Sequence, residues 1–548
     1  MSTAYKPPLS KTSTRQAVGF TYVWDEIGPH TPYGAKKKSA FKPYMPGDEA
    51  NLDDHYSDMS RLLDKICSSD KLVDLILTEL CELKEISASV ANSSVQVLSV
   101  PELFNIKGFL VHSRRLKKAA EEALGSVPAR YQLADTEDLL KTMDPTGDFL
   151  DTFYVYDSFS EKLTAYRKEN REIEAAIRRT KKGIRERLQR EHGFFMTPKF
   201  ELSVPRSNAE LLALADSLPE LIRTSEDYMN IIFEIKANDE VFALQKRQKD
   251  LAGLIEEEEL EVCRMLSGEI AKRKTVLTAN CEAVGCFDLD LAKCLYAKAH
   301  SCVRPQVLGE HRIIIEEGRN LQVEDALKAQ RREYMPVSIA LADGVTAITG
   351  ANMGGKTINL KMVTQCALMT QYALFIPAKR AEIGLSNYIH VLIGDSQNVQ
   401  RGLSSFGSEM EELKEMLDNA QPRSLLMIDE IASGTNPAEG FALTKSFMSY
   451  FAKKPYITII TTHFDHAANG EEVRNLQVKG LSGADFGKLA RELSTANRRQ
   501  RIEILGKYMD YRLIPVETVE EVPRDALNIA KILGIYDEII DEARTYLI

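Results

Sequence analysis

The sequence has few of the features that mark exported, membrane or disulfide-linked proteins. Its eight cysteines include no Cys-x-x-Cys pair, so neither a zinc site nor a disulfide framework is indicated. The start, MSTAYKPPLSKTSTRQ, is polar, and no apolar run approaches the roughly 20 residues that span a bilayer. We therefore expect a cytoplasmic protein without membrane contact. Its 548 residues, 44% of them hydrophobic, are enough for two or three domains.

The sequence also lacks the excess of positive charge that nucleic-acid-binding proteins usually carry. Its formal net charge is −10, so any contact with DNA requires a local basic patch. Residues 162–190 are a candidate, because Arg and Lys are frequent there and are interleaved with Glu. This pattern fits a DNA-facing helix, but charges at i and i+4 are more typical of a solvated helix face. Both interpretations stay open.

Apolar patterns divide the chain into three parts. Residues 1–51 mix Pro, Gly and Lys and are expected to form an irregular arm. Residues 52–305 show the spacing of long helices, with a small β-containing tip near 193–205. In residues 306–548, apolar strands alternate with helical stretches, which predicts an α/β domain on a mainly parallel sheet that returns to helix from Tyr511. We expect the helical part to act as a lever for the α/β domain.

A phosphate-binding loop stands near the start of the α/β region. The strand GVTAITG leads into GANMGGKT and then into a helix, which is the setting that the G-x-x-x-x-G-K-T motif requires. Glycines let backbone N–H groups surround the phosphates of ATP. Lys356 is expected to neutralise the β- and γ-phosphates, and the Thr357 hydroxyl to coordinate Mg²⁺. Four further loop residues are expected to hold the nucleotide: Gly350, Asn352, Gly354 and Gly355.

Two later strands end in chemically active side chains. The apolar strand SLLMIDE finishes in Asp429 and Glu430, and unpaired buried carboxylates are too costly to serve packing. Asp429 suits a direct or second-sphere ligand of Mg²⁺, and Glu430 suits the group that polarises the attacking water. The strand ITIITTH ends in His463, where a histidine can sense or hold the γ-phosphate. Together the motifs predict an enzyme that hydrolyses ATP to ADP and phosphate.

The order of these motifs is similar to that of the MutS family. GANMGGKTINLK resembles the MutS phosphate loop, and YMPVSIAL resembles the strand with the adenine-stacking aromatic, which would be Tyr334. IGDSQNVQRGLSSFGSEMEEL resembles the loop with the Ser-x-Phe-x-x-Glu-Met signature, filled by Ser404, Phe406, Glu409 and Met410. The resemblance implies an ABC-type P-loop NTPase fold and a homodimer or heterodimer, which the helical C-terminal segment would help to form. In such a dimer the signature serine of one subunit completes the ATP site of the other.

The resemblance does not extend to the mismatch-reading domain of that family. Residues 1–75 contain no Phe-x-Glu wedge motif, and Gln397 and Asn398 stand where the ATPase pattern usually has acidic residues. Two functions remain open. In the first, a MutS-like protein binds mismatched, branched or distorted DNA through its helical part. In the second, the chain resembles the reactivase ATPase of the cobalamin-dependent lysine 5,6-aminomutase and acts on a protein client.

Overall fold

The fold is taken from a computed structural model of the chain, which forms two compact units. The structure describes residues 7–150, 152–350, 355–393, 405–432, 435–470, 472–481, 486–494, 510–516 and 535–546, and also residues 504, 508, 527, 530 and 531. Unit 1 comprises residues 1–77, 119–131 and 284–548, and unit 2 comprises residues 78–118 and 132–283. This division differs from the expected boundary at residue 305, because the N-terminal segment belongs to the same unit as the α/β half.

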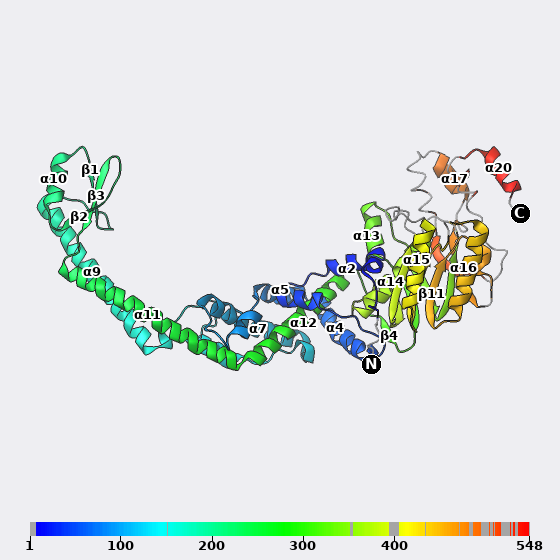
Figure 1. The fold of residues 1–548 in the computed structure, drawn as a ribbon, viewed down its shortest axis with the longest axis horizontal. Coiled ribbons are helices and arrows are strands. Elements are labelled where there is room, and N and C mark those ends of the chain that lie inside the picture. Colours follow the sequence, from blue (N-terminus) through cyan, green and yellow to red (C-terminus); the bar gives the residue numbers. More distant parts are fainter. Residues whose placement is uncertain are drawn as a thin grey trace. The chain divides into compact units, whose positions relative to one another are not determined.

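Unit 1 is built on a six-stranded sheet in the order β13-β12-β7-β11-β10-β9 (Figure 1). All neighbouring strands pair in parallel except β12 and β13. The strands are β7 (Gly344–Thr349), β9 (Tyr388–Ile393), β10 (Ser424–Asp429), β11 (Tyr456–Thr461), β12 (Val473–Gly480) and β13 (Asp510–Pro515). Every residue of β10 is buried, as expected for a central strand of a parallel sheet covered on both faces. The mixed α/β class predicted for this half of the chain is confirmed.

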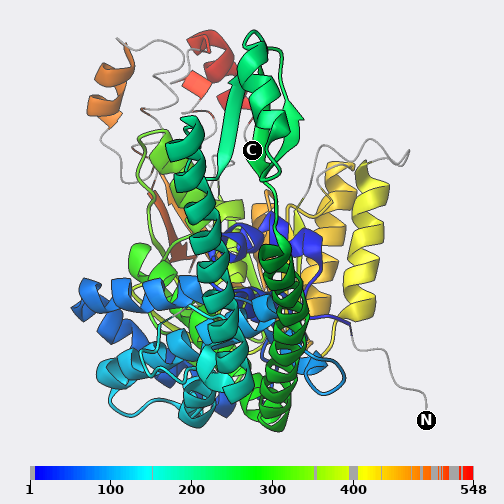
Figure 2. The ribbon, with the colours of Figure 1, turned by 90° about the vertical axis from the view of Figure 1, so that its left-hand side faces the viewer.

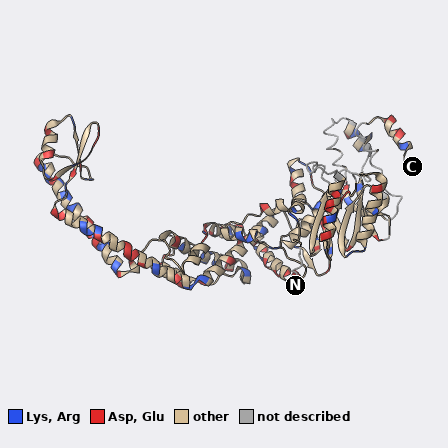
Figure 3. Ribbon diagram, in the orientation of Figure 1, with Lys and Arg blue, Asp and Glu red and all other residues tan. Residues whose placement is uncertain are grey.

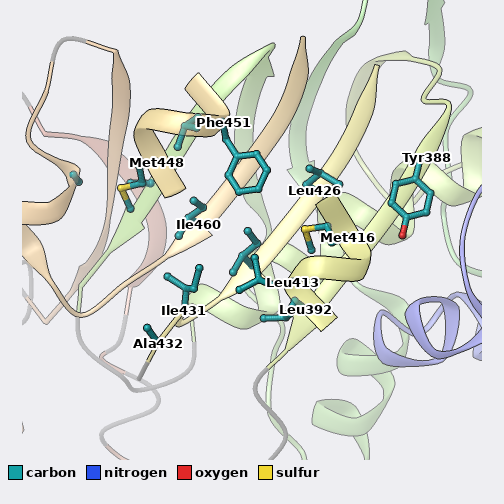
Figure 4. Packing of buried hydrophobic residues seen from close by; sticks show 14 residues of the cluster. Tyr388, Leu392, Leu413, Met416, Leu426, Ile431, Ala432, Met448, Phe451 and Ile460 are labelled. Carbon is teal, nitrogen blue, oxygen red and sulfur yellow. The ribbon is translucent and has the colours of Figure 1, made fainter. Parts of the chain in front are cut away.

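Helices cover this sheet and complete its core. Side chains of α15 and α16 form one buried cluster with β10 and β11, which includes Leu413, Leu426, Phe451 and Ile460 (Figure 4). The helices that contact the sheet are α14 (Lys356–Gln371), α15 (Ser405–Asn419), α16 (Pro437–Ala452) and the short η4 (Asp465–Ala468). Two further helices, α17 (Phe486–Ser494) and α20 (Asp537–Thr545), follow later in the chain. The prediction that a helix starts at Tyr511 is wrong, because residues 510–515 form strand β13 and pair with β12.

A second sheet and two long helices complete unit 1. Its four strands have the order β4-β8-β5-β6. They are β4 (Gln306–Leu308), β5 (Arg312–Gly318), β6 (Val337–Ala342) and β8 (Arg380–Gly384), with α13 (Leu321–Ala329) between β5 and β6 along the chain. Helix α4 (Glu49–Ser68) lies in unit 1, and α12 (Lys274–Ala299) belongs to it from residue 284 onward.

The N-terminal segment, expected to be an irregular arm, contains three short helices. These are α1 (Thr12–Ala17), α2 (Phe20–Glu26) and α3 (Pro32–Ser39). Thr31 caps α3 by accepting a hydrogen bond from the Gly34 N–H, and Pro32 occupies the first helical position, where a missing N–H costs nothing. Gly19 joins α1 to α2 with a φ of 78°, a conformation that favours glycine. The Pro and Gly residues of this segment therefore mark helix starts and turns.

The same segment is docked on the α/β core. The Tyr44 N–H donates to the Gln371 carbonyl at 2.7 Å, at the end of α14. The Ile389 N–H of β9 donates to the Leu9 carbonyl, also at 2.7 Å. Since backbone groups of two core elements are satisfied by this segment, it is part of the fold of unit 1.

Unit 2 contains two long helices that lie side by side and carry a small sheet (Figures 1 and 2). The helices are α9 (Glu161–His192) and α11 (Asp239–Lys272), and the elements between them are β1 (Glu201–Pro205), α10 (Ala209–Ser217), β2 (Leu221–Glu226) and β3 (Asn230–Ile235). The sheet has the order β1-β3-β2 with antiparallel pairing. This sheet is larger than the expected tip near 193–205, because β2 and β3 follow α10. Strand β3 pairs with β1, and β2 pairs with β3.

The remaining helices of the chain are short or cross the division between the units. They are α5 (Asp70–Glu82), α6 (Ser87–Asn92), α7 (Val100–Leu124) and α8 (Glu137–Met143), with the single turns η1 (Ala129–Tyr131) and η2 (Asp157–Phe159). None of the helices in the described residues combines the length and the apolar character needed to cross a membrane.

Candidate active site

Three parallel strands bring the predicted residues to one edge of the six-stranded sheet. Strand β11 lies between β7 and β10, with Ile460 opposite Ala347 on one side and Ile428 on the other. Because the strands run in the same direction, their carboxyl ends meet at the same edge. The phosphate-binding motif, the two carboxylates and His463 each follow one of these ends.

A carboxylate at this edge is held by two threonine hydroxyls. Thr357 Oγ1 donates to Asp429 Oδ2 at 2.6 Å, and Thr461 Oγ1 donates to Asp429 Oδ1 at 2.5 Å. Each oxygen of the Asp429 carboxylate therefore accepts one hydrogen bond, and the two bonds fix the orientation of the carboxylate. A threonine hydroxyl and an aspartate supply the hard oxygen ligands that Mg²⁺ takes in nucleotide sites, so this donor set fits the predicted ion.

Lys356, Glu430 and His463 form a triangle beside this carboxylate. Lys356 Nζ lies 3.2 Å from His463 Nδ1 and 3.5 Å from Glu430 Oε1, and His463 Nε2 lies 2.8 Å from the same Oε1. These contacts fit a neutral histidine that donates through Nε2 and accepts through Nδ1. The hydrogen bond from His463 lowers the pKa of the Glu430 carboxyl; burial opposes this and Lys356 assists it. Glu430 is thus held as a carboxylate, the form that can accept a proton from water.

The turn after β10 has an unusual backbone. Glu430 and Ala432 have φ angles of 55° and 57°, in the left-handed region that costs a non-glycine residue on the order of 1 kcal/mol. The Glu430 N–H donates to Thr461 Oγ1 at 2.9 Å, and the Ala432 N–H donates to Glu409 Oε1 at 2.6 Å. Side chains from β11 and from α15 therefore hold this turn in place.

Two predicted glycines lie where a larger residue would meet neighbouring atoms. Gly350 has a φ of 118°, and a Cβ there would lie 3.4 Å from the Val478 carbonyl oxygen. A Cβ on Gly355 would lie 3.1 Å from Tyr511 Cδ1 and also 3.1 Å from Val478 Cγ1. Backbone conformation favours glycine at the first position, and close approach favours it at the second.

Three predicted site residues lie outside the described residues: Asn352, Gly354 and Ser404. Helix α15 begins at Ser405, directly after the predicted signature serine. At the start of α15, Phe406 and Met410 pack against the buried cluster. That cluster contains Ile431 and Ala432 (Figure 4). The signature segment and the turn after β10 are therefore in direct contact.

Tyr334, predicted to stack on the adenine, lies between α13 and β6. Its hydroxyl is buried, which raises the pKa of that group. The next residue, Met335, accepts a hydrogen bond at its Sδ from the Tyr511 N–H at 3.4 Å. Tyr511 therefore links the Tyr334 segment to Gly355 of the phosphate loop. Sequence reasoning missed it, because nothing marks a single tyrosine in the stretch KYMDYRL.

Comparison with known proteins assigns these motifs to a family. Residues 346–504 match the family model for MutS domain V. Over 498 residues the chain is 26% identical to a protein named Endonuclease MutS2 from Bacillus mycoides, an alignment that covers 85% of this chain and 57% of that protein. The chain thus contains a MutS domain V and is similar to MutS2 proteins over most of its length. The resemblance predicted from the motifs is confirmed.

Some MutS2 relatives match over a shorter region. Endonuclease MutS2 from Clostridium botulinum is 31% identical over 311 residues, which cover 56% of this chain and 36% of that protein. The protein of that name from Acetivibrio thermocellus is 28% identical over 320 residues, which cover 57% of this chain and 36% of that protein. The chain spans little more than half the length of the Bacillus relative that it matches. The alternative of an aminomutase reactivase finds no support in these relatives.

Proposed function

We propose that this MutS-family chain hydrolyses ATP at the edge where β7, β10 and β11 end. The observation that carries the proposal is the triangle of Lys356, Glu430 and His463, whose polar atoms lie within 3.5 Å of each other beside the Thr357–Asp429 pair. A lysine that neutralises phosphate charge and a carboxylate that accepts a proton from water are groups that phosphoryl transfer to water uses, and the imidazole holds the carboxylate in place.

Each residue has a distinct part in this reaction. Lys356 exchanges its contact with Glu430 for the β- and γ-phosphate oxygens, because both partners are anionic. Glu430, released from the ammonium but still fixed by His463, accepts the proton of the attacking water. Thr357 and Asp429 would hold Mg²⁺, which supplies neutralisation of the phosphate charge.

Two substitutions test this site. Lys356→Ala is expected to abolish binding of a fluorescent ATP analogue, and Glu430→Gln to retain binding while losing hydrolysis by about a hundredfold or more. Glu439→Gln, an exposed carboxylate at the start of α16, serves as the control and is expected to behave as wild type. A wild-type hydrolysis rate in either site variant would refute the assignment.

The ATP sites are proposed to be composite, each completed by Ser404 of a second copy. The position of Ser404 directly before α15, whose first turns pack on the catalytic turn, supports this. Ser404→Ala and Lys356→Ala proteins should each be inactive alone. Mixed at random, they should regain about a quarter of the wild-type rate, because half the dimers contain one intact site of two. No recovery would leave the site assignment standing but remove its composite character.

DNA is the proposed client, and the C-terminal half of α9 is the proposed contact surface. Residues 178–190 contain seven Lys and Arg against one Glu. Figure 3 shows basic and acidic residues interleaved along the two long helices of unit 2. Within the described residues, Arg178, Arg179 and Arg190 are exposed and have no carboxylate in salt-bridge range. Lys181 and Arg185 lie over the ring of Phe200, at 5.9 and 5.5 Å from its centre. Unpaired basic residues beside an aromatic ring suit a phosphate backbone.

The ATPase rate with and without duplex, mismatched and branched DNA, at near-physiological salt, tests the client. Stimulation together with tight binding is the expected result. An active ATPase that is indifferent to every DNA would overturn the DNA role and favour a protein client. Unit 2 would then convey the nucleotide state of unit 1 to that protein.

A further inference from the structure

Glu409 is the polar link between α15 and the turn that carries Glu430. Its Oε1 accepts the Ala432 N–H at 2.6 Å, two residues after the catalytic carboxylate. Burial raises the pKa of Glu409, and the bond from Ala432 acts against this rise. A partly buried carboxylate is costly unless it is well hydrogen-bonded, so its position serves this contact.

The turn is packed from a second side by α16. Thr444 Oγ1 lies 3.4 Å from the Ile431 carbonyl oxygen, and a Cβ on Gly440 would lie 2.9 Å from the Ala432 carbonyl oxygen. The apolar contacts of Phe406 and Met410 add to this packing. Helix α16 therefore limits the carbonyl side of the turn, while Glu409 holds its N–H side.

We propose that Glu409 is a positioning residue for ATP hydrolysis. By holding the Ala432 N–H, it keeps the turn in the left-handed conformation in which Glu430 reaches His463. Without this bond, Glu430 can relax from its φ of 55° to a more favourable backbone region. The carboxylate would then leave the geometry needed to accept a proton from water.

The positioning role rests on the ATP hydrolysis proposed above.

A variant series tests the positioning role. Glu409→Ala should lower kcat about tenfold or more, while KM and the affinity for a fluorescent ATP analogue change by less than about twofold. Glu409→Gln retains an acceptor oxygen and should recover most of the rate. Glu411→Ala, an exposed carboxylate on the same helix, is the control.

Three results would overturn the positioning role. They are a wild-type kcat in Glu409→Ala, equal losses in kcat and in nucleotide affinity, and no recovery in Glu409→Gln. If Glu409→Ala does not fold, Glu409→Asp replaces it, because the side chain shortened by one methylene cannot reach the Ala432 N–H. Glu409→Asp should then lower kcat and leave the nucleotide affinity nearly unchanged, as expected for Glu409→Ala.

Mixed dimers separate this inference from the composite site. Glu409 acts on its own copy and Ser404 on the other, so a Glu409→Ala copy paired with a Ser404→Ala copy has one intact site. Random mixing should therefore restore about a quarter of the wild-type rate. If Lys356→Ala with Ser404→Ala recovers but this pair does not, Glu409 does not act within its own copy. If neither pair recovers, the composite site fails, and the variant series alone decides the positioning role.

Discussion

Charged side chains have opposite surroundings in two regions of the molecule. In unit 1, Asp290 of α12 is buried and contacts His55 Nε2 at 2.7 Å, the Tyr131 hydroxyl at 2.9 Å and Lys293 Nζ at 3.5 Å. Burial acts to raise the pKa of Asp290, yet its charged and hydrogen-bonded neighbours outweigh burial and hold that pKa well below its usual range. The cluster is ionic, buried and fully paired.

Along α9 and α11 of unit 2, the ion pairs lie at the surface. Arg247 Nε is 2.8 Å from Glu169 Oε1, and the two side chains are 47% and 40% exposed. An exposed pair contributes little to stability, whereas breaking a buried pair leaves a charge without solvent or partner. The difference indicates that charge serves rigidity in the first region and stays available for a partner in the second.

The buried cluster has a further consequence, because it reaches the helix that follows the phosphate loop. Lys293 Nζ donates to the Tyr372 carbonyl at 3.2 Å, and the Tyr56 hydroxyl donates to the Leu374 carbonyl at 2.8 Å. Both carbonyls lie just beyond the last residue of α14, whose first residue is Lys356. The end of α14 opposite the proposed ATP site is therefore anchored by side chains of α4 and α12.

Removing the central carboxylate should give the largest effect on stability. Asp290→Ala leaves Lys293 and His55 buried without their partner, so the free energy of unfolding should fall by about 3–5 kcal/mol in urea denaturation. Because the folded pKa is depressed, the contribution of Asp290 is complete above the ordinary aspartate value of about 4 and is lost as the pH falls through the folded pKa. Glu169→Ala, the surface control, should leave unfolding unchanged. Equal effects of the two substitutions would refute the contrast.

Charge reversal on α9 should have the next largest effect, and on binding rather than on stability. Changing Arg178, Arg179 and Lys182 to Glu should weaken DNA binding by about tenfold or more and reduce the slope of log affinity against log salt by about three. The ATPase rate without DNA should be unchanged, because these residues lie in unit 2.

The control for this variant carries the same change in net charge. It reverses three exposed lysines of unit 1: Lys328, Lys379 and Lys414. DNA affinity close to wild type is expected there. If both triple variants weaken binding equally, the interaction follows the overall charge of the protein and not the surface of α9.

The sequence predicted which polar side chains lie together at the sheet edge more completely than it predicted the fold around them. Lys356, Thr357, Asp429, Glu430 and His463 were placed at strand ends by local patterns, and parallel pairing brings such ends together. Their chemistry also depends on residue type, which the sequence states directly. The contacts between these side chains could not be predicted from the sequence, because the distances between them depend on the order of the strands in the sheet.

Other features depend on contacts between distant segments, which local patterns do not encode. The composition of residues 1–51 suggested an irregular arm, since Pro and Gly mark turns whether or not the segment is docked. Strands β2 and β3 were missed because they follow a helix capped by Asn208, and because β3 pairs with β1 across that helix while β2 pairs with β3. The bond between Glu409 and Ala432 joins a signature residue to a turn 23 positions later, and no sequence rule links the two.

The pair of Glu430 and His463 lies between the two extremes of burial. Its loss should lower kcat and should also cause the smallest of the effects considered, a shift in the pH dependence of the reaction. Its side chains are 31% and 36% exposed, so the hydrogen bond is partly screened by solvent. That bond is the main cause of the lowered pKa of Glu430, and His463→Ala removes it. The pKa of Glu430 should then rise, and the acid limb of kcat/KM should move to higher pH, since a larger share of Glu430 is protonated at a given acidic pH. His466→Ala, an exposed histidine nearby in sequence, is the control and should leave the limb in place. A limb that stays fixed in His463→Ala would mean that another group sets the acidic side of the profile, and Glu430 would lose its assignment as the base.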